Sequence, residues 1–491
     1  MTFVRPAHAF YVVPFVALMI LAGCAGGTSI GAAGNALPAP SGAATSVPAS
    51  AAPIQAPPTP GATTNATPMP GATSGATVKT PASCVKGSTP APLPVGGSLG
   101  AGQLIGAWGA TVGGSATAPT NGSVRDMAMM SIGGTAIRIR LINTDATNPL
   151  VVCSAYAGLQ LKNPGPALVP GSSRQITFNG GQPGITLPPN TPFAYSDSVA
   201  FNVNPQQIVG VSLYLPASTA ASSSNATWNS SYSTANGAGD DTRDESGATF
   251  TTDMSGPLFD ATFGTGQQED LEGGSTYALA AIDVMTTAAN GAVVGLGSST
   301  FQGDESEQDE YDDVMSLMGT DMNARVPAGT RKGIVNMGLA GDSLYIALAG
   351  RFARDVFTQT GVTGVILYDI NDMDPQNGMR TLAQVEGSYE LAVSESHAHG
   401  IRVFCATWGP ESLSDISQIE SDERSQLNQW ILTSGVCDDT VDWATVLADP
   451  SEPLTYNPAY FSDSIHPNAA GHAAIASAVA YTRWFEVGAY P

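Results

Sequence analysis

The sequence predicts an antiparallel β-sandwich followed by an α/β domain built on a parallel sheet. Two regions with different patterns lead to this fold class. Residues 96–285 contain short apolar or alternating runs separated by Gly, Pro and Asn clusters, with no helical periodicity of any length. Residues 286–491 instead alternate strand-like apolar runs with amphipathic segments of helical length. Regularly spaced short strands are typical of a sandwich, whereas strand–helix alternation is typical of βαβ units with helices on both faces of a sheet.

The individual elements follow from these patterns. In the first region we expect strands at 136–141, 175–178, 199–203, 209–215 and 277–284. In the second region we expect parallel strands at 292–296, 333–337, 362–368 and 401–404. Helices are expected between or after them at 311–320, 343–359, 379–397 and 416–433. Chemistry in open α/β sheets lies at the carboxyl ends of the strands, so the residues that follow the parallel strands are the functional candidates.

Composition and charge limit the classes of function. The chain has 491 residues, of which 43% are hydrophobic, and 41 acidic residues against 18 basic ones give a net charge of −23. A strongly negative protein repels phosphate backbones and gains nothing from counterion release, so we expect no nucleic-acid partner. The same charge disfavours binding to anionic lipid through a basic face. Membrane attachment would therefore require a covalent lipid.

The first 23 residues have the pattern of a secretory signal peptide. Arg5 precedes an apolar run at 11–20, which is too short to span a bilayer, and Leu21-Ala22-Gly23-Cys24 follows. This tetrapeptide resembles the lipobox of bacterial lipoproteins, which implies cleavage before Cys24 and lipidation of its thiol. Several acyl chains give stable anchoring. We therefore expect a bacterial cell-envelope protein, lipid-anchored or secreted, and Ala25 in place of Asp favours the outer membrane.

Residues 24–95 are predicted to be a disordered tether. They consist mostly of Ala, Pro, Gly, Thr and Ser, with almost no aromatic or charged residues. Such a segment cannot bury enough apolar area to offset its ordering entropy. Its prolines favour a partly extended chain that holds the folded part away from the membrane.

The cysteines beyond Cys24 predict disulfides. Their even number in an exported protein favours two bridges among Cys84, Cys153, Cys405 and Cys437. The strand-like surroundings of Cys405 and Cys437 favour a bridge between these two, which leaves Cys84 with Cys153. Three pairings remain compatible with the sequence alone. No spacing matches a zinc site, so we expect no metal and no cofactor.

Histidine is scarce, which narrows the choice of a general base. Beyond the signal segment there are four: His397, His399, His466 and His472. Imidazole is the commonest base near neutral pH. The first two lie at the end of a predicted helix, so we expect them to have a structural or surface role, and His472 lies on the C-terminal helix, where we expect a structural role. His466 lies in a polar loop three residues after Asp463, a spacing at which a carboxylate reaches imidazole Nδ1 and fixes its tautomer.

Three further candidates follow the predicted parallel strands. They are Ser299 after the first strand, Gly341 after the second and Asn371 after the third. With Asp463 and His466 behind them, these blocks resemble, in order and separation, those of the SGNH (GDSL-type) hydrolase family. The resemblance spans residues 286–491 and implies a three-layer α/β catalytic domain.

The resemblance assigns a function to each of these residues. Ser299 would be the nucleophile, His466 the base and Asp463 the carboxylate that orients it. The backbone N–H groups of Ser299 and Gly341 and the side-chain amide of Asn371 would form the oxyanion hole. The implied activity is serine-dependent hydrolysis of a small or polymeric carboxylic ester: a lipid, an acetylated sugar or a polyester.

Two positions depart from the pattern of the family. Ser298 stands where the family has Asp before the nucleophile, and Asp369 stands where it has Gly in the third block. Neither departure removes a group that performs a chemical step. Asp369 adds a negative charge near the expected oxyanion site, so a catalytically inactive relative stays open as an alternative.

The string Gly341-Asp342-Ser343-Leu344 spells the nickname of the family but is not expected to hold the nucleophile. If Ser343 were the nucleophile, no segment would remain for the second block before Asn371. The run at 293–299 would also be unexplained. We expect Ser343 to begin a helix.

The first domain carries a resemblance of its own. Four of its segments resemble the β-domain that precedes the catalytic domain in some secreted relatives of lysophospholipase L1: 123–125, 137–143, 196–198 and 211–216. Contact with a glycan, covering of the active-site cleft and structural support are the three functions considered for it.

The acidic stretch at 304–313 could suggest calcium, but it lacks the spacing of a calcium loop. Acidic residues are favoured at a helix N-terminus by its dipole, so we expect a solvated helix start there. Two alternatives to ester hydrolysis remain for the whole chain. One is a non-catalytic envelope lipoprotein that binds glycans or partners, and the other is an O-acyltransferase on the same fold.

Overall fold

The structure is a computed structural model. It describes residues 84, 99–111, 114–117, 121–216, 220–223, 239–251, 259–262, 268–271, 276–307, 309–368, 372–373, 380–410, 418–463, 465–486 and 490. For 114–117, 220–223, 259–262, 268–271 and 418–420 only the backbone is described. The predicted signal peptide with Cys24, and the predicted tether apart from Cys84, lie outside the described residues. Both therefore remain expectations from the sequence.

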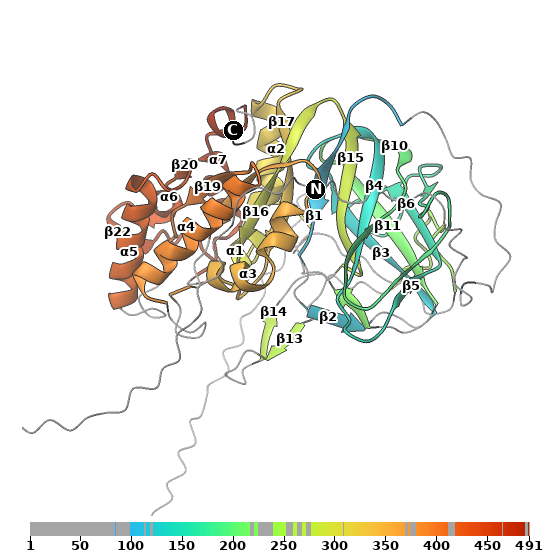
Figure 1. Cartoon of the computed structure of the whole chain (residues 1–491), viewed down its shortest axis with the longest axis horizontal. Coiled ribbons are helices and arrows are strands. Elements are labelled where there is room, and N and C mark those ends of the chain that lie inside the picture. The colour runs from blue at the N-terminus through green and yellow to red at the C-terminus, as the bar shows by residue number, and fades with distance from the viewer. Residues whose placement is uncertain are drawn as a thin grey trace, which may run out of the picture. The chain divides into compact units, whose positions relative to one another are not determined.

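The first folded region is a sandwich of two antiparallel sheets (Figure 1). One sheet has the order β1-β15-β4-β10 with β9 added beside β4: β1 Gln103–Gly109, β15 Leu279–Thr286, β4 Gly134–Asn143, β10 Val199–Val203 and β9 Thr191–Tyr195. The other has the order β3-β11-β6-β7: β3 Gly122–Met129, β11 Ile208–Leu215, β6 Ser154–Leu159 and β7 Arg174–Gln175. The predicted sandwich is confirmed, although the segment at 175–178 contributes only the end of the short strand β7.

Three two-stranded pairs accompany the sandwich. They are β2 Gly114–Thr117 with β12 Ala220–Ser223, β5 Leu150–Val152 with β8 Ile185–Leu187, and β13 Phe259–Thr262 with β14 Gln268–Leu271. The core of the sandwich is formed by branched apolar side chains such as Ile137, Ile139 and Ile282. Ile137 and Ile139 both lie on β4, and Ile137 is paired with Val284 on β15.

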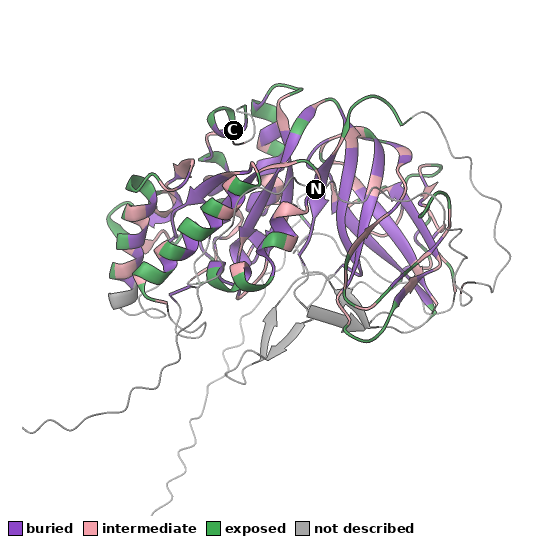
Figure 2. Cartoon of the chain, viewed as in Figure 1, coloured by how far each residue is buried: buried purple, intermediate pink, exposed green. Residues whose placement is uncertain are grey.

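The second region is a five-stranded parallel sheet. Its order is β17-β16-β18-β19-β20: β17 Arg331–Gly338, β16 Ala289–Gly297, β18 Val362–Tyr368, β19 Arg402–Ala406 and β20 Asp439–Val441. The run 291–296 of β16 is buried throughout, as expected for a strand covered on both faces (Figure 2). The chain passes from the sandwich to this sheet between Thr286 and Ala289.

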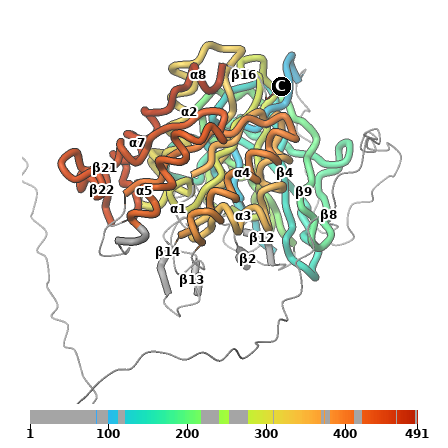
Figure 3. Tube along the Cα trace, turned by 60° about the vertical axis from the view of Figure 1, so that its left-hand side comes forward, coloured from blue at the N-terminus to red at the C-terminus, as the bar shows by residue number. Residues whose placement is uncertain are grey.

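Helices cover this sheet in two groups (Figure 3). One group packs around α2 Val314–Arg325, which contacts β17: α7 Ala469–Ser477 and α8 Tyr481–Phe485. The other packs around α4 Leu382–Ala398, which contacts β19: α3 Leu344–Gly350 and α5 Gln418–Thr433. Short elements complete the fold: α1 Ser299–Gln302, α6 Trp443–Leu447, and the hairpin of β21 Ala448–Asp449 and β22 Glu452–Tyr456. The predicted α/β domain is confirmed.

Two helices differ in extent from their predictions. The helix expected at 343–359 is interrupted: α3 ends before Arg351, and a π-helical turn follows at Ala353–Phe357. α2 begins later than expected because Asp313 caps it, with a carboxylate that accepts hydrogen bonds from the N–H groups of Met315 and Ser316.

The acidic stretch before α2 is solvated only in part: Glu307 and Glu310 are exposed as predicted, but other carboxylates of the stretch are not. Asp304, Asp309 and Asp313 are all buried. The reason is that neighbouring parts of the chain cover it. Asn163 of the sandwich donates a hydrogen bond to the Asp309 carbonyl, and His472 of α7 bonds with the Asp304 carbonyl.

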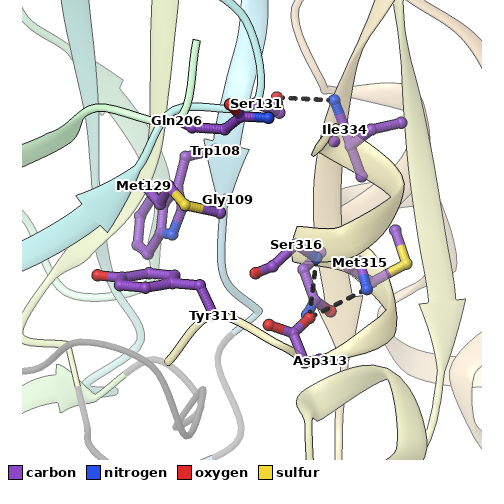
Figure 4. A pocket seen from close by; sticks show the side chains of 12 residues that line it. Trp108, Gly109, Met129, Ser131, Gln206, Tyr311, Asp313, Met315, Ser316 and Ile334 are labelled. Atoms are coloured by element: carbon purple, nitrogen blue, oxygen red, sulfur yellow. Dashed lines mark hydrogen bonds between the residues drawn. The ribbon is translucent and has the colours of Figure 1, made fainter. Parts of the chain in front are cut away.

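The sandwich packs directly against the parallel sheet. β1 lies against β17, and a Cβ atom at Gly333 would collide with the carbonyl oxygen of Gly106. A pocket of about 40 Å³, partly open to solvent, lies at this junction and is lined by Trp108, Met129, Tyr311 and Ser316 among others (Figure 4).

Both disulfides favoured by the sequence are present. Cys84 is bonded to Cys153, and Cys405 of β19 is bonded to Cys437, just before β20. The second bridge therefore joins β19 to the segment that leads into its parallel neighbour β20. Among the described residues, no helix has the length and apolar character needed to cross a bilayer.

Replacing Cys405 and Cys437 together by Ala should lower the free energy of unfolding by about 3–4 kcal/mol. The bridge joins residues 32 apart in sequence, and its loss releases that loop in the unfolded chain. Urea unfolding of the oxidised protein and of the double variant measures the difference. Free thiols at these two positions in unreduced protein, detected by alkylation and peptide mapping, would contradict the pairing.

Candidate active site

Ser299 lies directly beyond the carboxyl end of β16, as the first residue of α1. Its side chain is largely buried, and so is its neighbour Ser298, whose hydroxyl has no hydrogen-bond partner among the described residues. An ionised carboxylate at position 298 would be buried without a donor from the described residues, which is costly. The local packing therefore suits Ser298 in place of the Asp that the family pattern carries.

Ser299, His466 and Asp463 form one hydrogen-bonded chain, although 167 positions separate the serine from the histidine. The Ser299 hydroxyl oxygen lies 2.9 Å from His466 Nε2. His466 Nδ1 lies 2.6 Å from Asp463 Oδ2. The second carboxylate oxygen of Asp463 accepts the N–H groups of Ile465, at 2.8 Å, and of His466 itself. The carboxylate is thus fixed by its own loop and fixes the imidazole in turn.

The segment 338–342, which begins with the last residue of β17, has one backbone amide that no described acceptor takes. Four of its N–H groups donate to acceptors nearby: Gly338 to Asn336 Oδ1 (2.9 Å), Leu339 to the Gly297 carbonyl (3.0 Å), Ala340 to Gln302 Oε1 (2.6 Å) and Asp342 to the Leu339 carbonyl (3.1 Å). The fifth, at Gly341, has no acceptor in the described part of the chain. Gly341 has a φ of +70°, a left-handed conformation that favours glycine.

The amide of Ser299 is the second donor left for a ligand, since no described acceptor takes it either. Gly297 and Gly338 are paired in register, so the two strand ends that lead to Ser299 and Gly341 lie side by side. Two backbone donors beside a serine hydroxyl can bind an oxygen that becomes negative during attack on a carbonyl group. The third predicted donor, Asn371, lies outside the described residues, as does Asp369.

Charges around His466 favour its protonated form. Burial alone would lower the pKa of the imidazole, but the hydrogen bond with Asp463 and the negative charges of Asp304, Asp463 and Glu305 outweigh it and raise the pKa. Asp304 Oδ2 lies 3.9 Å from His466 Nε2, on the side of the ring that faces Ser299. Burial would raise the pKa of Asp463, yet its bond with His466 holds that pKa below the ordinary value.

His472 is a structural histidine, in line with the expectation from the sequence. It is fully buried, which lowers the pKa of its imidazole to about 4 and keeps the ring neutral. The N–H of Val314 donates to Nδ1 at 3.2 Å, so Nε2 carries the proton and donates to the Asp304 carbonyl at 3.1 Å. His472 thereby joins the start of α2 to the loop that bears Asp304.

The contacts of three other residues singled out from the sequence do not involve Ser299. His397 Nε2 bonds with Asp438 at 2.9 Å, and the His399 ring stacks on Phe357. Ser343 caps α3, with a side chain that accepts from the N–H of Ile346, as expected of a residue that begins a helix.

Three residues of this site were missed from the sequence: Asp304, Gln302 and Asn336. Asn336 is a polar residue within the otherwise apolar run of β17, and this was a usable signal. Its amide donates to the Phe301 carbonyl at 2.5 Å, which joins β17 to α1. Among the described residues, no group of three or more His, Cys, Asp or Glu could hold a metal ion.

The imidazole of His466 should titrate above the ordinary value of 6.5, because nearby carboxylates stabilise its positive charge. Asp304→Asn removes one of these charges and should lower that pKa. Histidine NMR titration of the two proteins measures the shift, with Asp438→Asn as the control because this carboxylate contacts only His397 among the histidines. A His466 pKa below 6.5, or one that Asp304→Asn leaves unchanged, would contradict this electrostatic account.

No protein-family model matches the chain, and no curated protein matches it. Among solved structures, the chain is similar to a GDSL-like lipase from Bacteroides thetaiotaomicron, with 18% identity over 38% of this chain and 85% of that chain and a TM-score of 0.31. It is also similar to a variant of an acetyl-xylooligosaccharide esterase from Geobacillus stearmophilus, with 20% identity over 40% of this chain and 95% of that chain, at the same TM-score of 0.31. An α/β hydrolase from the metagenome of Lake Arreo, Spain, matches with 22% identity over 39% of this chain and 94% of that chain, again at 0.31.

Proposed function

We propose that the protein is a serine-dependent carboxylic ester hydrolase in which Ser299 is the nucleophile. The observation that carries the proposal is the hydrogen-bonded chain from the Ser299 hydroxyl through His466 to Asp463, with distances of 2.9 and 2.6 Å. A serine hydroxyl is a weak nucleophile unless a base takes its proton, and a base within this distance does so. Asp463 holds the imidazole in the tautomer that leaves Nε2 free to accept.

The proposed reaction has two halves. Ser299 Oγ attacks the ester carbonyl carbon while His466 Nε2 takes its proton, and the carbonyl oxygen becomes negative between the N–H groups of Ser299 and Gly341. The intermediate then releases the alcohol, which receives the proton from His466. Water attacks the resulting acyl-serine with His466 again as base, and the acid leaves as Ser299 recovers its proton.

The negative charges near His466 stabilise the imidazolium that forms in each half. Asp463 lies at Nδ1, and Asp304 lies 3.9 Å from Nε2. The same charges impose a condition on the reaction: His466 must be neutral to accept a proton. Because its pKa is raised, the fraction of enzyme with a neutral base falls already at mildly acidic pH.

Ser299→Ala should lower the turnover of p-nitrophenyl acetate by about four orders of magnitude or more, since no other group can form the acyl intermediate. Ser343→Ala is the matched control, because Ser343 is the serine of the literal Gly-Asp-Ser-Leu string. Ser343 caps α3, so its loss affects the stability of that helix and leaves turnover measurable.

Spectrophotometric assay of p-nitrophenol release compares the two variants with the parent protein. Loss of activity in Ser343→Ala with full activity in Ser299→Ala would reject Ser299 as the nucleophile. If neither the parent protein nor the variants hydrolysed the ester, the result would favour a non-catalytic binding protein. Transfer of the acyl group to an added sugar, found by product analysis, would favour an O-acyltransferase.

We also infer that the protein is anchored in the cell envelope through lipid on Cys24. The inference rests on the sequence Leu21-Ala22-Gly23-Cys24 after an apolar run. Cys24→Ser should abolish incorporation of an alkyne-labelled fatty acid during expression of the full chain in a bacterium, whereas Ser29→Ala should retain it. Equal labelling of Cys24→Ser and the parent would contradict the anchor.

A further inference from the structure

A buried arginine lies beneath the loop that carries the Gly341 amide. Arg351 follows α3 and has a residue exposure of 7%. Its guanidinium donates to the Gly297 carbonyl at 3.1 Å, to the Met337 carbonyl at 2.8 Å and to the Asp342 carboxylate at 2.5 Å. These acceptors lie at the end of β16, at the end of β17 and directly after Gly341. One side chain therefore holds together both strand ends that supply the proposed oxyanion donors.

A second carboxylate fixes the guanidinium from the other side. Asp355 Oδ2 accepts from Arg351 Nη1 at 3.1 Å, and Asp355 Oδ1 accepts from Arg354 Nε at 2.7 Å. Burial would raise the pKa of Asp355, but the hydrogen bond from Arg354 and the charges of both arginines lower it, so this carboxylate is ionised. Two arginines and two aspartates thus balance in charge. Removing one partner of such a buried set is strongly destabilising for the others.

The sandwich contributes the last member of this network. Thr111 lies just beyond β1 and is 244 residues from Asp355 in sequence, with a residue exposure of 1%. Its hydroxyl donates to Asp355 Oδ2 at 2.5 Å and accepts from Arg354 Nη2 at 3.2 Å. A continuous set of hydrogen bonds therefore leads from the sandwich through Asp355 and Arg351 to Asp342, the neighbour of Gly341.

We propose that Arg351 is a positioning residue for the oxyanion hole and that the β-sandwich holds it in place through Thr111. This inference rests on the proposed function. The Gly341 amide must point at the position where negative charge develops, and a displacement of about 1 Å in such a site costs about a hundredfold in rate. Arg351 contacts the chain on both sides of Gly341. It donates to the carbonyl of Met337 before the loop and to the carboxylate of Asp342 directly after Gly341.

Thr111→Val tests the link because it removes only the hydroxyl and keeps the shape of the side chain. We expect kcat for p-nitrophenyl acetate to fall about tenfold with KM unchanged, since the donor geometry matters in the transition state and little for substrate binding. Thr111→Ser keeps the hydroxyl and should restore kcat. Arg351→Gln should lower kcat by about a hundredfold.

Thr360→Val is the matched control at the same junction. Thr360 donates to Asp283 Oδ2 at 2.8 Å and accepts from Arg138 Nη2 at 3.1 Å, an ion pair that does not contact Arg351. The substitution makes the same chemical change, so kcat should stay at the parent value. Each kcat is expressed per site titrated with a serine-directed phosphonate, which removes the effect of any unfolded fraction.

The inhibition constant of phenylboronic acid is a second measurement, and it does not depend on how much of the protein is folded. Boronate forms a tetrahedral adduct with the serine and places an oxygen in the oxyanion hole, so its inhibition constant should rise about tenfold in Thr111→Val and stay unchanged in Thr360→Val. Equal kcat and equal boronate affinity in Thr111→Val, Thr360→Val and the parent would overturn the inference. Full activity in Ser299→Ala would instead reject the proposed function itself. The experiment therefore distinguishes failure of the inference about Arg351 from failure of the proposed function.

Discussion

The site depends on one constraint, the in-register parallel pairing of β16 with both of its neighbours. Gly297, the last residue of β16, is paired with Gly338 of β17 and with Tyr368 of β18. Because all three strands run in the same direction, their carboxyl ends meet at one edge of the sheet, and the segments that follow them lie close together. Ser299 and the loop that carries Gly341 are neighbours for this reason alone, although they are far apart in sequence. His466 then needs only a loop from the C-terminal part of the chain to reach them.

Buried hydrogen bonds fix the conformation of the 338–342 loop, which the sheet places beside Ser299. The other amides of the 338–342 loop donate to Asn336, Gln302 and neighbouring carbonyl groups, and the Gly341 amide is the one that no acceptor in the described residues takes. Each buried hydrogen bond stabilises the folded protein by about 1 kcal/mol net, but a buried donor or acceptor left without a partner costs more. The loop is therefore held in the conformation that satisfies these hydrogen bonds. Arg351 adds hydrogen bonds to the carbonyl groups of Gly297 and Met337, at the ends of the two strands. The same principle connects the sandwich to the site, because Thr111 completes the hydrogen bonds of Asp355.

The fold class could be predicted because apolar runs of strand length and amphipathic segments of helical length are local signals. Ser299, Asp463 and His466 were instead assigned from the order of several blocks that resemble those of a known hydrolase family, since a serine after Gly297-Ser298 has no distinctive signal of its own. The residues that support them could not be predicted, since their partners lie far away in sequence: Asp304 with His472, and Arg351 with Gly297. The burial of Asp304, Asp309 and Asp313 within the acidic stretch could not be predicted for the same reason. A run of carboxylates predicts exposure until tertiary contacts, here from Asn163 and His472, cover it.

The central claim is that Ser299 is the activated nucleophile, and covalent labelling tests it most directly. A fluorophosphonate reacts with a serine hydroxyl only where a base removes its proton and donors stabilise the oxygen, which is the arrangement found around Ser299. After incubation of the purified full chain, proteolysis and mass spectrometry locate the modified residue. The account predicts one phosphonyl group per chain, on Ser299, and none after His466→Ala. Labelling at Ser343, or an unmodified Ser299 in folded protein, would contradict it.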